Sequence, residues 1–65
     1  MCQTSVVMEQ GGSEELLLEN VTALEVIEGG LSITTLFEGQ KDFPGVAISR
    51  IDFNDGKVFL YKTAA

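Results

Sequence analysis

The chain has 65 residues, of which 45% are hydrophobic, with one cysteine and no histidine. This size predicts one domain over residues 1–65, and the hydrophobic fraction is too high for a disordered chain. A single cysteine excludes an internal disulfide, and the lack of histidine excludes catalytic pairs of histidine with serine or cysteine. We therefore expect a folded domain that is not an enzyme. Because so small a core is commonly supported by a disulfide, a metal or a second subunit, we also expect a homodimer.

Ten acidic and four basic residues give the chain a formal charge of −6. This charge repels phosphate backbones and disfavours RNA as a partner. No apolar run approaches the roughly 18 residues that a membrane-spanning helix requires. The first residues also lack the basic region and apolar core of a secretion signal. We therefore expect a cytoplasmic protein without a membrane anchor, in which the thiol stays reduced.

Glycines separate short runs rich in branched and aromatic residues, which is typical of an all-β fold. The first two runs, residues 3–8 and 14–19, are expected to pair as a hairpin over the loop 10–13. Residues 14–19 also have a composition that suits a helix, but the segment is too short for a stable one. Two strands are the prediction here.

A second hairpin is predicted around Gly29-Gly30, because a type I′ turn needs two residues that tolerate positive φ. Residues 24–28 and 31–35 would be its strands. This register places Glu28 opposite Leu31, and it puts four apolar side chains on one face that we expect to be core. These side chains are Leu24, Val26, Leu31 and Ile33.

Residues 37–45 are polar at first and contain the only proline, so we expect a loop with Pro44 and Gly45 at the centre of a type II turn. The following segment Asn54-Asp55-Gly56 predicts a three-residue turn, across which Phe53 would pair with Lys57. The whole pattern predicts a small antiparallel β-barrel or curled sheet of five to seven short strands.

The register of this last hairpin separates its side chains into two faces. The aromatic face is expected to be core, because a domain without tryptophan needs its other aromatic residues inside. The opposite face is more apolar than a solvated surface requires, and it is the predicted subunit interface. The expected core side chains are Phe53, Phe59 and Tyr61, and the expected interface side chains are Ile48, Val58 and Leu60.

An alternative use of the aromatic face is RNA binding. Lys57, Phe59 and Tyr61 alternate along one strand, and exposed aromatic side chains on small β-barrels stack on RNA bases. The same side chains are needed for the core, so packing is the favoured interpretation. RNA binding is kept as the alternative function.

The remaining candidate site is the start of the chain, where Cys2 follows Met1. The Cys2 thiolate, the Cys2 backbone nitrogen and the Met1 α-amine are separated by few bonds, so one ion could close two five-membered rings. Nickel(II) and copper(II) favour such nitrogen and sulfur ligands. A cysteine at this position can also be simply a small apolar residue. Because one chain offers few ligands, we expect two chains of a dimer to share one ion.

Several short motifs across essentially the whole chain resemble the CooT family of small nickel-binding proteins. They are Met1-Cys2, Glu28-Gly29-Gly30, Leu-Phe-Glu-Gly at 36–39, Pro-Gly-Val-Ala-Ile at 44–48 and Ile-Asp-Phe at 51–53. The resemblance implies a homodimeric barrel of Sm-like or SH3-like character, with Cys2 as the essential nickel(II) ligand. It also implies a nickel carrier or sensor that serves carbon monoxide dehydrogenase, in contact with a nickel-enzyme maturation protein.

Overall fold

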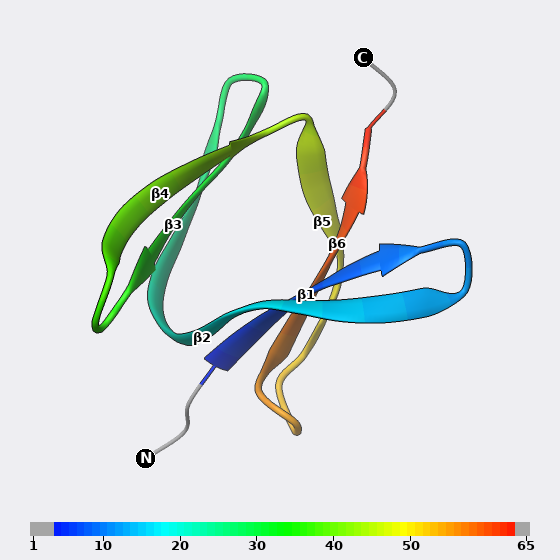
Figure 1. The fold of residues 1–65 in the computed structure, drawn as a ribbon, viewed down its shortest axis with the longest axis horizontal. Helices are drawn as coiled ribbons and strands as arrows, with labels where there is room; N and C mark the ends of the chain where they lie inside the picture. The colour runs from blue at the N-terminus through cyan, green and yellow to red at the C-terminus, as the bar shows by residue number, and fades with distance from the viewer. Residues whose placement is uncertain (1–3, 64–65) are drawn as a thin grey trace.

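The computed structural model describes residues 4–63, which form six strands of one sheet. The strands are β1 Thr4–Gln10, β2 Ser13–Ile27, β3 Gly30–Thr35, β4 Gly39–Pro44, β5 Val46–Asp52 and β6 Lys57–Lys62. They are arranged in the order β4-β3-β2-β1-β6-β5, and the sheet curls into a half-barrel (Figure 1). The predicted all-β curled sheet is therefore confirmed. Four of its pairings are antiparallel, whereas β1 and β6 run parallel.

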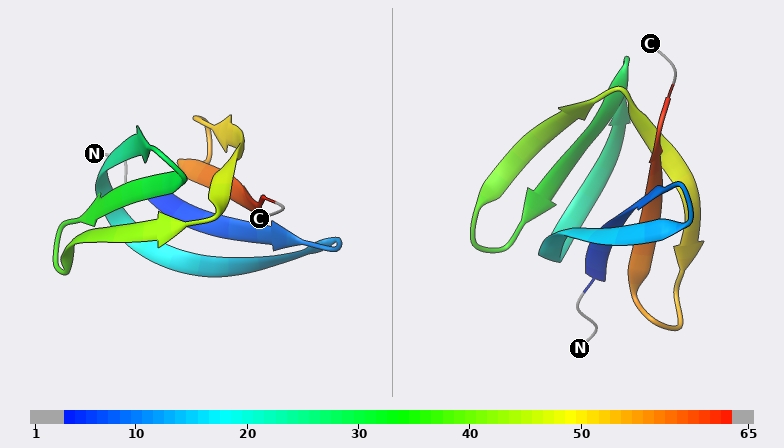
Figure 2. Two further views of the ribbon diagram at one scale, coloured as in Figure 1. Left: turned by 90° about the horizontal axis from the view of Figure 1, so that it is seen from above. Right: turned by 45° about the vertical axis from the view of Figure 1, so that its right-hand side comes forward.

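Strand β2 belongs to both halves of the sheet, because it bends and pairs with a different strand on each side of the bend. Its first part pairs with β1 and its second part pairs with β3. Register shifts interrupt the ladder on both sides of Val6, and Asn20 has a positive φ of 57°. Such bulges bend a strand and increase its twist. The two predicted strands 14–19 and 24–28 are thus parts of one long bent strand, whose curve is visible in Figure 2.

The core lies on the concave side of the half-barrel. Its most deeply buried side chains are aliphatic and come from β1, β3 and β6, with Leu18 of β2 and Val46 of β5 completing it. Parallel pairing aligns Val6 with Val58 and Met8 with Leu60. The buried cluster comprises Val6, Met8, Leu18, Leu31, Ile33, Val46, Val58 and Leu60.

The register of the hairpin between β2 and β3 differs from the predicted register by two residues. Ile27 pairs with Gly30, so the turn is Glu28-Gly29 and only Gly29 has positive φ. Leu31 and Ile33 are buried as expected, but Val26 is 72% exposed. Gly30 is unavailable for the turn because it is a strand residue, paired with Ile27 on one side and Pro44 on the other.

Gly30 lies so close to β4 that a side chain has no room. A Cβ atom built on it would contact the Phe43 carbonyl oxygen and lie 2.8 Å from the Pro44 Cα. We expect Gly30→Ala to lower the free energy of unfolding by about 1–3 kcal/mol, the usual cost of overpacking. Urea denaturation followed by circular dichroism measures this change. The control is Gln10→Ala at an exposed position, and equal midpoints for the two variants would contradict the close approach.

The segment after β3 also differs from the predicted loop. Residues 39–44 form the edge strand β4, which pairs with β3 along its whole length. Proline is tolerated here because it ends an edge strand. Gly45, at φ 72°, then turns the chain into β5, and its N–H donates to the Gly29 carbonyl oxygen at 2.7 Å.

The final hairpin is shifted by one residue from the predicted register. Asp52 pairs with Lys57, and the loop is residues 53–56. The Asp52 carboxylate accepts the N–H groups of Asn54 and Asp55, both at 3.0 Å, and so stabilises this longer loop. Phe53 is 86% exposed rather than in the core.

The assignment of the two faces of β6 was wrong, apart from the burial of Phe59. Val58 and Leu60 belong to the buried cluster, and Ile48 packs against it. The predicted subunit interface is therefore core, and Tyr61 is half-exposed on the other side. The cause is the parallel pairing with β1, which orients Val58 and Leu60 toward the same side as Val6 and Met8.

Candidate functional site

The chain enters the sheet at the end where the β5–β6 loop lies. Met1 and Cys2, the predicted metal ligands, fall outside the described residues 4–63. The first described residue, Thr4, pairs with Val21 of β2. Ser5 pairs with Lys57, and its N–H donates to the Gly56 carbonyl oxygen at 2.8 Å. The segment that carries Cys2 is therefore joined to the sheet beside the loop 53–56.

The loop between β3 and β4 belongs to the same end of the sheet. Val21, the partner of Thr4, also pairs with Thr35 at the end of β3. The Leu36 N–H donates to the Asn20 carbonyl oxygen at 2.9 Å, which ties the loop to the bend of β2. The start of β1 thus lies between the β3–β4 and β5–β6 loops (Figure 1).

These two loops carry exposed apolar side chains. Phe37 is 79% exposed and Leu36 is 65% exposed in the first loop, and Phe53 is the most exposed large apolar residue in the second. Single exposed apolar residues are ordinary, but several at one end of a small domain indicate an interaction surface. Sequence reasoning missed this feature, although a phenylalanine next to turn residues was the available signal.

The described residues contain no second candidate metal site. Within residues 4–63, no three side chains of histidine, cysteine, aspartate or glutamate come together. Residues 4–63 also contain no helix that is long and apolar enough to cross a membrane.

Of the two aromatic side chains proposed for RNA stacking, Phe59 is covered and Tyr61 is half-exposed. Phe59 is only 4% exposed, and the guanidinium carbon of Arg50 lies 3.7 Å from the centre of its ring. Arg50 is held there by Glu9, whose carboxylate is 3.5 Å away and also accepts a hydrogen bond from Ser49. A base could stack on Phe59 only after Arg50 moved away. The favoured interpretation, that this aromatic face packs in the core, holds only for Phe59, which is buried on the convex face; Tyr61 is 45% exposed and Phe53 is 86% exposed.

Comparison with known proteins assigns the chain to a family. Residues 1–61 match the family described as CO dehydrogenase accessory protein CooT. The chain belongs to the CooT family. It is 35% identical over 60 residues to an uncharacterized protein of Methanothermobacter thermautotrophicus, covering 92% of this chain and 88% of the relative.

The CooT fold is also found in a solved structure. A crystal structure of a protein assigned as CooT from Carboxydothermus hydrogenoformans superposes with a TM-score of 0.85 at 30% sequence identity. The match covers 97% of this chain and 100% of the other. The half-barrel fold of this chain is therefore shared with a solved CooT structure.

Proposed function

We propose that this CooT-family protein binds nickel(II) through Cys2 and nitrogen from Met1, and carries or senses nickel for the maturation of carbon monoxide dehydrogenase. The observation that carries the proposal is the single thiol of the chain, at position 2, in a family of CO dehydrogenase accessory proteins. The position of Thr4 supports it, because the segment with Cys2 joins the sheet at the end with exposed apolar loops.

The chemistry of these ligands makes binding depend on pH. A free thiol has a pKa of about 8.5 and an α-amine one of about 7.7–8.0, and both must lose a proton to bind metal. Affinity therefore rises as the pH increases from 6 to 8. Thiolate and nitrogen ligands favour nickel(II) over harder ions such as magnesium.

The proposal includes a homodimer, since one chain supplies few ligands and two chains could share one ion. The interface cannot be the face of Val58 and Leu60, because these side chains are buried within the monomer. Phe53 and the partly exposed Ile51 offer a better surface, at the end of edge strand β5 and beside the start of β1. Joining two copies there would place the starts of their β1 strands near the interface.

Native mass spectrometry with nickel(II) titration tests the site and its stoichiometry. We expect one nickel ion for two chains. The thiolate charge-transfer band should increase in intensity until this ratio of nickel to protein is reached. Phe53→Ser is expected to weaken the dimer roughly tenfold, because a large aromatic contact is lost. One ion for each isolated chain would contradict the shared site and leave only a one-chain chelate.

RNA binding has less support than nickel binding. The chain has a formal charge of −6, and Phe59, the central aromatic of the proposed stacking face, lies under Arg50. Within residues 4–63, no contact favours a stacked RNA base over the Arg50 guanidinium that covers the Phe59 ring.

A further inference from the structure

The loop between β5 and β6 contains the only Asp-Gly step of the chain, Asp55-Gly56. Such a step is chemically reactive, because the backbone nitrogen of the glycine can attack the side-chain carboxyl carbon of the aspartate and close a five-membered ring. Glycine leaves this attack unhindered, since it has no side chain. In a folded protein the reaction also requires a carboxyl group and an attacking N–H that are free of other contacts.

Both groups of this step are free in the loop. Asp55 is exposed, and over residues 4–63 its carboxylate accepts no hydrogen bond and forms no ion pair. Within the same range no acceptor is found for the Gly56 N–H, and only the Gly56 carbonyl oxygen is engaged. Exposed loop tips of small and polar residues also tolerate local rearrangement. The structure therefore leaves both reacting groups without competing contacts.

The other two aspartates are less suited to this reaction. The Asp52 carboxylate accepts the N–H groups of Asn54 and Asp55, both at 3.0 Å. Asp42 lies within strand β4, where the backbone is fixed by pairing with β3. Each of them is followed by a phenylalanine, whose side chain hinders the approach of the backbone nitrogen.

Asn54 is exposed as well, and an asparagine can close the same kind of ring with loss of ammonia. The attacking nitrogen in that case belongs to Asp55. Its N–H is donated to the Asp52 carboxylate, so this nitrogen is held away from the Asn54 side chain. The hydrogen bond that stabilises the loop therefore protects Asn54 and leaves Asp55 reactive.

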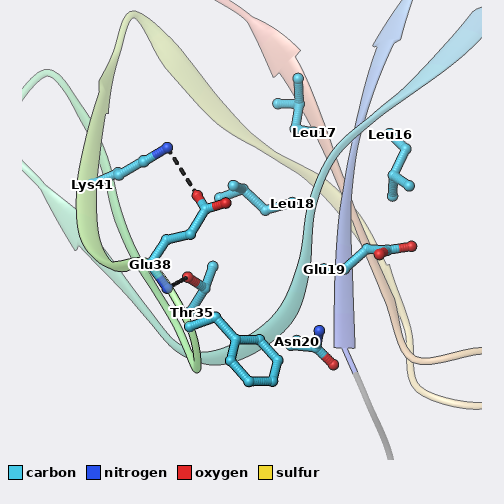
Figure 3. A pocket seen from close by; sticks show the side chains of 9 residues that line it. Leu16, Leu17, Leu18, Glu19, Asn20, Thr35, Glu38 and Lys41 are labelled. Carbon is cyan, nitrogen blue, oxygen red and sulfur yellow. Dashed lines mark hydrogen bonds and ion pairs between the residues drawn. The ribbon is translucent and has the colours of Figure 1, made fainter.

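Two glutamates also precede glycines, at positions 28 and 38. The glutamate side chain is one carbon longer, so the corresponding ring has six members and forms much more slowly. In the β3–β4 loop, the Glu38 carboxylate is in addition engaged by the Lys41 ammonium at 2.9 Å (Figure 3). Asp55 is thus the acidic side chain best placed to react with its neighbouring backbone.

We propose that Asp55 is a site of spontaneous isomerisation to a β-linked aspartate. The Gly56 nitrogen forms a bond to the carbon of the protonated Asp55 carboxyl group, whose hydroxyl leaves as water with the amide proton. One water molecule then opens the ring. Attack on the former side-chain carbonyl restores aspartate, whereas attack on the former backbone carbonyl leaves the chain linked through the side chain, with a free α-carboxylate. One water is released and one is consumed, and no oxidant or cofactor takes part.

The β-linked product changes a contact at the start of β1. It has one more carbon atom in the backbone, which lengthens the chain by up to about 1.5 Å. The added atom lies directly before Gly56, whose carbonyl oxygen accepts the Ser5 N–H at 2.8 Å. Ser5 is also the first residue of β1 that pairs with β6. Isomerisation therefore weakens the attachment of β1 beside this loop.

The test is incubation of the metal-free protein at mildly acidic pH in water enriched in the heavy oxygen isotope. Ring opening places one heavy oxygen atom at residue 55, which peptide mass spectrometry locates. The α-carboxylate of the product also accepts a methyl group from S-adenosylmethionine when an isoaspartyl methyltransferase is added. We expect both signals at Asp55 and neither at Asp42 or Asp52. Asp55→Glu, which keeps the charge, should lose both signals.

A synthetic peptide of residues 51–57 separates the effect of the fold from that of the sequence. In the peptide no fold holds the Asp55 N–H, so both Asn54 and Asp55 should react, whereas the folded chain should react at Asp55 alone. Hydrogen exchange of the Ser5 amide should be at least about tenfold faster in the isomerised protein than in fresh protein, because its acceptor has moved.

Three results would overturn the proposal. They are no heavy oxygen at residue 55 of the protein after the peptide has reacted, reaction of Asn54 as fast as Asp55 in the folded chain, and unchanged hydrogen exchange at Ser5 in the isomerised protein. None of these measurements involves nickel, so they succeed or fail independently of the proposed metal site.

Discussion

Cys2→Ser is expected to abolish tight nickel binding. A serine hydroxyl stays protonated near neutral pH and is a harder, weaker ligand for nickel(II) than a thiolate, so we expect a loss of affinity of roughly 100-fold or more. The chain has no other cysteine and no histidine to replace the lost ligand. The thiolate charge-transfer band should disappear in the same titration, while the far-ultraviolet circular dichroism stays unchanged.

A second variant tests the role of the amine. Adding Gly-Ser before Met1 moves the α-amine away from Cys2 but keeps the thiol, so binding should weaken less than in Cys2→Ser. The Met8→Leu variant controls for methionine sulfur, since Met8 is buried in the core. Tight nickel binding that survives in Cys2→Ser would refute the proposed site.

Leu60→Ala is expected to unfold a large share of the molecules. Leu60 is fully buried at the centre of the cluster, and truncation of such a leucine costs about 2–5 kcal/mol. At about 0.05–0.15 kcal/mol per residue, a 65-residue domain has only about 3–10 kcal/mol of stability. The loss is therefore a large part of the total, and urea denaturation at fixed protein concentration measures it.

Leu36→Ala is the matched control for this change. It removes the same atoms from a residue that is 65% exposed, so the free energy of unfolding should change by less than about 0.5 kcal/mol. The pair also tests the orientation of β6. If Leu60→Ala were as mild as Leu36→Ala, the face of Val58 and Leu60 would not be the core.

The sequence predicted features that depend on nearby residues. Glycine spacing and branched residues indicated strands and hairpins, and these were found because turn chemistry and β-propensity act over a few residues. The burial of Leu31 and Ile33 followed from the same local alternation. Cys2 was predicted as a metal ligand because it is the only thiol in a chain without histidine.

Other features depended on contacts between distant parts of the chain. The β4 strand forms because its backbone pairs with the edge of β3, although residues 39–44 include turn-forming and charged residues. The face of β6 that becomes core is decided by β1, more than 40 residues earlier in the chain. A register shift of only one residue exchanges the core face and the solvent face of a strand. When both faces carry apolar side chains, the local sequence pattern does not show which face is core.

By itself, the sequence determined the all-β class, the approximate positions of three hairpins, the charge and the single thiol, because each follows from composition or from neighbouring residues. The tertiary structure alone decided the registers, the orientation of β6 and the placement of Phe37 and Phe53 at the end where β1 begins. The physical reason is that strand pairing joins residues far apart in the chain, and the burial of side chains on one face of the complete sheet selects among registers that are locally similar.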